Sequence, residues 1–178
     1  MIQSKRSMTG AMAMLLSAAA LCAAAPAGQI LLRGDGLVAG GKPLVFGRSL
    51  RADAIAAVTR ILGKPNKIGS HGDCGQGDVI AYARFRGDFE LSFVKGKLAG
   101  WSEDGQTLAT DKGIRAGSSV AALRKAYRDV SIDSGDEANG GVGPSFQREA
   151  GPNGWLDGTK PNSHVSGLFA GATCLPGA

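Results

Sequence analysis

Two cysteines and two histidines are the residues of this sequence best suited to specific chemistry. Cys74 and Cys174 are the two cysteines that lie outside the apolar N-terminal run of residues 11–25. In an oxidising compartment two thiols most simply form one disulfide, here closing a loop of about 100 residues. Zinc is the alternative, because His71 precedes the first cysteine by three residues and His164 precedes the second by ten. Neither spacing matches a zinc knuckle, so we predict the disulfide and no metal site.

No recognised catalytic motif accompanies these histidines. The chain contains no Gly-x-Ser-x-Gly elbow and no His-Glu-x-x-His. A sulfur atom in a disulfide cannot act as a thiolate nucleophile. Asp88, Glu90 and Glu103 could pair for glycoside hydrolysis, but their spacing does not select two of them. We therefore predict no catalytic residues and no cofactor.

An acidic segment, residues 133–143, offers hard oxygen ligands of the kind that calcium prefers. Asp133, Asp136 and Glu137 lie in it, close to glycines. The order of acidic residues in an EF-hand loop is missing. A solvated loop is the favoured interpretation, and a calcium site in this segment stays open.

Candidate recognition residues follow from alternation along predicted strands. In residues 79–85 the pattern sets Tyr82 and Arg84 on the side opposite Ala83 and Phe85. In residues 89–93 it sets Glu90 and Ser92 opposite Phe89 and Leu91. We expect these polar alternates to share one face of a sheet, free to bind a partner.

Two tryptophans complete the candidate binding set. Trp101 and Trp155 each lie at the end or start of a predicted strand. A tryptophan in a sheet belongs to the core more often than to a contact surface, so both roles stay open. The predicted binding residues are Tyr82, Arg84, Glu90, Trp101 and Trp155.

The N-terminus has the pattern of a secretory signal peptide. Lys5 and Arg6 precede an apolar run from Ala11 to Ala25, which ends in a small-x-small site at residues 25–27. The run is shorter than the ~20 residues that a membrane span needs. We predict cleavage after residue 27, no transmembrane anchor afterwards, and a periplasmic or secreted protein. Lipidation at Cys22 is disfavoured, because Leu21 stands where a small residue is needed.

The composition limits the partners. The chain has 178 residues, 43% of them hydrophobic and 20% charged, with a formal net charge of +5. Residues 28–178 fit a single domain large enough for a real core. No run of lysine or arginine exceeds two residues, so nucleic acid is not an expected partner.

The predicted elements are one helix in each half of the chain, each followed by short strands. Ser49 is a candidate N-cap for a helix that ends at Gly63, and Ser118 is one for a helix carrying Val120 and Leu123. A glycine-rich loop is expected over residues 69–77 and a meander over residues 79–101. The second half offers strands near residues 145–148, 154–156 and 165–170.

The two helical stripes repeat at a distance of 65 residues: Ile55, Val58 and Leu62 match Val120, Leu123 and Tyr127. We therefore predict an internal duplication, with repeats at about residues 44–101 and 108–174. The expected fold is α+β: two helix-plus-antiparallel-meander repeats packed as one body, with both helices on one side of the sheet. Chance alignment of two helices is the alternative.

This plan resembles the tandem modules of β-lactamase inhibitory protein and of the related small outer-membrane assembly lipoproteins. The likeness lies in Ser49 to Pro65, the meander up to Trp101, and Gly113 to Tyr127. It implies helices on an antiparallel sheet whose other face binds a protein. The chain differs in having one clear helix per repeat, where those modules have two, and in lacking a lipobox.

The predicted function is a non-catalytic exported module that binds or inhibits another envelope or extracellular protein. An exposed patch of aromatic residues and arginine on the sheet would favour this prediction. An envelope structural or assembly factor is the first alternative. A hydrolase is the second, and a pocket holding His71 or His164 with an acid would favour it.

Overall fold

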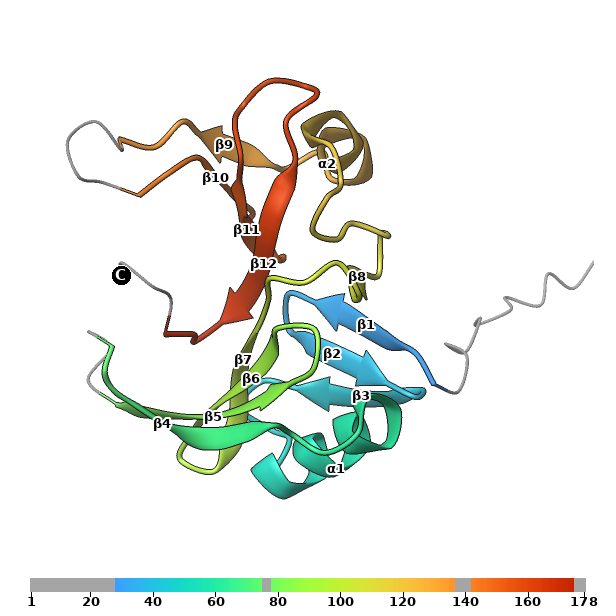
Figure 1. The fold of residues 1–178 in the computed structure, drawn as a ribbon, viewed down its shortest axis with the longest axis vertical. Coiled ribbons are helices and arrows are strands. Elements are labelled where there is room, and N and C mark those ends of the chain that lie inside the picture. The colour runs from blue at the N-terminus through green and yellow to red at the C-terminus, as the bar shows by residue number, and fades with distance from the viewer. Residues whose placement is uncertain (1–27, 75–77, 137–141, 175–178) are drawn as a thin grey trace, which may run out of the picture.

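The computed structural model describes residues 28–74, 78–136 and 142–174, and most of its regular structure is β (Figure 1). Twelve strands form two sheets, and these residues contain two short helices. The predicted α+β fold of two helix-plus-meander repeats is therefore wrong. The predicted export segment, residues 1–27, lies outside the described residues.

The smaller sheet has four strands in the order β3-β2-β1-β8. Two tight hairpins join β1 to β2 and β2 to β3, and β8 adds to β1 in parallel. Gly40 and Gly41 form the second hairpin turn with φ values of 57° and 81°, which favour glycine. The strands are β1 (Ile30–Arg33), β2 (Gly36–Ala39), β3 (Lys42–Val45) and β8 (Ala109–Thr110).

The larger sheet has eight antiparallel strands in the order β4-β5-β6-β7-β12-β11-β10-β9. Two runs of four consecutive strands meet where β7 pairs with β12. The sheet turns sharply there, so the two runs lie at an angle to each other (Figure 1). The strands are β4 (Lys67–Asp73), β5 (Val79–Phe85), β6 (Phe89–Val94), β7 (Lys97–Glu103), β9 (Ser131–Asp133), β10 (Ser145–Gln147), β11 (Asn153–Leu156) and β12 (Val165–Gly171).

The core lies between one face of the large sheet and the small sheet. Trp101 is fully buried there, and its Nε1 donates hydrogen bonds to the carbonyl oxygens of Arg33 (3.0 Å) and Gly36 (2.9 Å) in the β1–β2 hairpin. Strand β7 contacts both β2 and the first helix. A second sheet, rather than a layer of helices alone, therefore covers the large sheet, which is why the predicted architecture fails. The core side chains include Leu32, Leu37, Leu44, Phe85, Phe89, Leu91, Phe93 and Leu98.

The two helices differ from each other and from the predicted caps. Helix α1 (Arg51–Leu62) has 12 residues and ends at Gly63, whose φ is 84°. Its N-cap is Leu50, and Ser49 Oγ instead accepts a hydrogen bond from Val45 N. Helix α2 (Val120–Ala126) has 7 residues. Its N-cap is Ser119, which accepts from Ala122 N, and not Ser118.

Residues 67–73 form strand β4, where a glycine-rich loop was predicted from residue 69 onward. Gly69 lies opposite Tyr82 of β5, and a Cβ at residue 69 would lie only 2.9 Å from Tyr82 Oη. The tyrosine ring therefore covers the strand where a side chain would otherwise pack. Cross-strand pairing outweighs the low strand propensity of glycine.

Cys74 and Cys174 form a disulfide, as predicted, with their Cα atoms 5.5 Å apart. Cys74 follows the edge strand β4, and Cys174 follows β12 shortly after its last residue. The bond thus ties the outer edge of one run of strands to the end of the other run. Neither described helix has the length and apolar character that a bilayer span requires.

Candidate functional site

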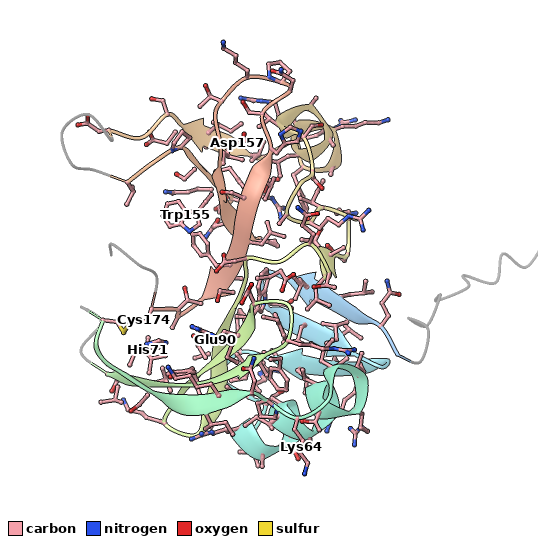
Figure 2. All side chains as sticks on the ribbon, in the orientation of Figure 1. Lys64, His71, Glu90, Trp155, Asp157 and Cys174 are labelled. Carbon is pink, nitrogen blue, oxygen red and sulfur yellow. A yellow bond between two sulfur atoms is a disulfide. The ribbon has the colours of Figure 1, made fainter. Side chains whose placement is uncertain are left out.

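A cleft of about 580 Å³ opens on the face of the large sheet that points away from the small sheet. The strand pleat determines which side chains reach it, because Ala83, Phe85, Leu91 and Trp101 take the core positions. Figure 2 shows Trp155 on one run of strands facing the same opening as His71 and Glu90 on the other. The residues that line the cleft are His71, Arg84, Glu90, Ser102, Asp104, Trp155 and Cys174.

Glu90 is the centre of the hydrogen-bond network in the cleft. Its side chain is only 7% exposed. Its Oε2 accepts two hydrogen bonds from Arg84, from Nε at 3.1 Å and from a terminal nitrogen at 2.9 Å. Its Oε1 lies 3.1 Å from Nε2 of His71. Three neighbouring strands, β4, β5 and β6, thus present one fixed polar cluster, which is characteristic of a preorganised site.

Tyr82 holds the basic side chains of this cluster in place. The His71 ring stacks on the Tyr82 ring, with centroids 4.4 Å apart and an interplanar angle of 27°. The guanidinium carbon of Arg84 and the ammonium of Lys67 each lie 5.9 Å from the centre of the same ring. Tyr82 itself is only 6% exposed. It supports the side chains that reach the cleft more than it contacts a ligand directly.

Asp104 adds a second carboxyl group to the cleft. Burial raises the pKa of its carboxyl group, and the nearby carboxylates of Asp88 and Glu90 raise it further, against the opposing effect of Arg84. The close approach of Asp104 to β12 requires Gly167, because a Cβ there would lie 2.5 Å from Asp104 Oδ1. The site therefore combines an arginine held on one carboxylate with a second carboxylate lacking a direct cationic partner among the described residues.

Trp155 lines the opposite side of the cleft. Its ring packs against Phe169 of β12 with centroids 5.4 Å apart, and it is partly exposed. Residue 155 alternates with the buried Gly154 and Leu156, so the pleat of β11 points the indole away from the core. A supported, partly exposed tryptophan is a typical anchor for a binding partner.

Three of the five predicted binding residues line the cleft: Arg84, Glu90 and Trp155. Tyr82 lies beneath them in a buried supporting position. Trp101 is the exception, because its exposed fraction is 0% and its indole joins the two sheets. Its proposed binding role is corrected to a core role.

Ser102 and Asp104 are members of the cleft that sequence reasoning missed, and it considered His71 only for a zinc site or a hydrolase pocket. His71 was assigned to a loop because glycines hide the alternation of β4, in which residues 67, 69 and 71 share one face. Asp104 follows β7 directly, and its position depends on the pairing of β7 with β12, which lies far along the chain.

Glu90 holds its two basic neighbours in place. Both oxygens of the Glu90 carboxylate accept hydrogen bonds, one from His71 and the other from Arg84. Among the described residues, no group of three His, Cys, Asp or Glu side chains could hold a metal ion. A calcium site in residues 133–143 stays open, because residues 137–141 of this segment lie outside the described part of the chain.

Comparisons with known proteins do not assign the chain to a family. No protein-family model matches the chain, and no curated protein matches it. Among solved structures, the uncharacterized protein yfeY from Escherichia coli is similar over 83% of this chain and 99% of its own, with 14% sequence identity and a TM-score of 0.49.

Proposed function

We propose that this protein is an exported, non-catalytic module of the bacterial envelope that binds another protein in the cleft, in the manner of an inhibitor. One observation carries the proposal: Arg84 and His71 are fixed on the buried Glu90 opposite a partly exposed Trp155. Side chains held in place before binding lose little conformational entropy when a partner arrives. Arginine and tryptophan are also the residue types that dominate binding energy at protein interfaces.

Export is part of the same proposal. It rests on the basic start and apolar run of residues 1–27 and on the disulfide between Cys74 and Cys174. The bond joins the edge of β4 to the end of β12, so it holds the angle between the two runs of strands that form the cleft. An oxidising compartment is the environment in which this support for the site persists.

The test is capture of a partner from an envelope extract, followed by a binding measurement with the purified partner. We expect Trp155→Ala and Asp104→Asn each to weaken binding at least tenfold while the melting temperature changes little. Arg124→Ala is the matched control, because this exposed residue of α2 lies outside the cleft. Equal affinity for wild type and both cleft variants would refute the proposal, as would the absence of any specific partner.

A hydrolase is the second candidate, and a specific observation favours it. His71 and Glu90 lie 3.1 Å apart in a cleft that also contains Ser102. A histidine oriented by a carboxylate is a common general base. Assay of ester, peptide and glycoside substrates decides between the candidates. Turnover lost in His71→Ala but kept in His164→Ala would establish the hydrolase, and no turnover by the wild type would favour the binding module.

A further inference from the structure

A second cavity of about 580 Å³ lies at a different place on the molecule. It is formed where the end of α1, the start of β1, the β5–β6 turn and the segment around β8 meet. None of its lining residues belongs to the cleft described above. Its volume falls within the ~300–1,000 Å³ range of small-molecule sites.

The floor of this cavity is apolar. Ile30 and Leu108 are 2% and 7% exposed and belong to the hydrophobic core, so core side chains pack against both residues beneath the floor. Ile61 and Leu62, in the last turn of α1, are half-buried and leave part of their side chains open to the cavity. Covering such a surface with the alkyl chain of a ligand is favourable, because apolar surface is removed from water.

Two arginines line the same cavity. Arg86 is in the β5–β6 turn, and Arg115 precedes α2; both are exposed. Among the described residues, neither guanidinium group is held by an ion pair or a side-chain hydrogen bond, in contrast to Arg84 and Arg148. No acidic residue is among the described residues that line the cavity. In the described part of the chain, the charged side chains that line the cavity are therefore those of the two arginines.

We propose that this cavity binds a single-chain fatty acid, with the alkyl chain on the apolar floor and the carboxylate between Arg86 and Arg115. Guanidinium groups match the planar pair of oxygens in a carboxylate and form short, charge-assisted hydrogen bonds with it. The two sites share no residue, so binding in this cavity is independent of the cleft and of the function proposed for it.

The experiment is isothermal titration calorimetry with octanoate and decanoate, each below its critical micelle concentration. The protein is purified in the form that the expressing cells produce after any processing, and bound lipid is removed first. We expect saturable binding at one site. Affinity should rise on the order of tenfold for the two added methylenes, since each buried methylene is worth about fourfold. Decyltrimethylammonium, which has the same chain and the opposite charge, should not bind.

Variants test the head-group site. Arg86→Ala and Arg115→Ala should each weaken decanoate binding at least fivefold, the double variant should abolish it, and Arg124→Ala should leave it unchanged. The melting temperatures should stay the same, because both arginines are exposed. Wild-type affinity in the double variant would overturn the proposal, as would equal affinity for octanoate and decanoate. Tighter binding of decyl phosphate than of decanoate would overturn the assignment to a fatty acid.

Discussion

Glu103 is a carboxyl group on the core side of β7, with an exposed fraction of 0%. Its Oε1 accepts a hydrogen bond from Leu108 N at 3.3 Å, while its Oε2 is buried with no partner among the described residues. Burial raises its pKa from the usual 4.5 to about 7, and the nearby Asp104 and Asp88 add to the shift. Below about pH 7, Glu103 therefore favours its neutral form in the folded protein.

This shift makes stability depend on pH. Between pH 4.5 and about 7, the unfolded chain has lost the proton of Glu103 and the folded protein retains it. The unfolded state binds fewer protons, so the free energy of unfolding falls as pH rises through this window, by up to about 3 kcal/mol. Glu103→Gln, a neutral side chain of the same shape, should flatten the slope. Urea unfolding at pH 5, 6, 7 and 8 measures it, and an unchanged slope would contradict the assignment.

At the scale of elements, β4 depends on the contact between a glycine and an aromatic ring. Gly69 leaves room for Tyr82, which in turn supports His71 by stacking. Pairing with β5 stabilises β4 as a strand, although the composition of β4 is typical of a loop.

Gly69→Ala should therefore destabilise the protein by about 1–2 kcal/mol, because the new Cβ would press on a nearly buried ring. The control is Gly72→Ala in the same strand, where a Cβ would meet nothing within 4 Å. Chemical denaturation of the two variants gives the comparison. Equal stability of the two would show that Tyr82 moves away freely, and the proposed support for His71 would then be wrong.

At the scale of the whole molecule, Trp101 and the disulfide hold together parts of the chain that are distant in sequence. The Trp101 indole joins the large sheet to the β1–β2 hairpin, and the Cys74–Cys174 bond joins β4 to the end of β12. The first contact links the two sheets, and the second lies beside the cleft, where Cys174 is one of the lining residues.

Trp101→Phe should reduce the free energy of unfolding by about 2–4 kcal/mol, because it replaces a fully buried indole by a smaller phenyl ring and removes the N–H that two carbonyl oxygens share. Trp155→Phe is the matched control and should cost less, since that indole is partly exposed and no hydrogen bond to it is found among the described residues. Thermal unfolding followed by circular dichroism provides the measurement. A smaller loss for Trp101→Phe than for Trp155→Phe would contradict the core role.

Replacing both cysteines by serine should lower stability by up to about 4–5 kcal/mol, because the bond closes a long loop in the unfolded chain. It should also weaken partner binding by more than the change in folded fraction explains, since the cleft loses the link between its two sides. Binding measured well below the melting temperature separates the two effects. Full affinity in the folded double variant would show that the sheet alone maintains the cleft.

The sequence by itself determined local features. Alternation in residues 79–85 and 89–93 correctly set Tyr82, Arg84 and Glu90 on the face opposite the core, because the strand pleat is a property of neighbouring residues. Cys74 and Cys174, the two cysteines outside the predicted signal peptide, were enough to predict the disulfide. These inferences needed no knowledge of which segments meet in space.

Tertiary structure alone decided the rest. The pairing of β7 with β12 joins segments about 65 residues apart, and it brings Trp155 and Asp104 to the same cleft as Glu90. Contact with the β1–β2 hairpin placed Trp101 in the core, and pairing with β5 made a strand of residues 67–73. Local patterns cannot predict such outcomes, because the free energy that stabilises them comes from surfaces the chain buries only once it has folded.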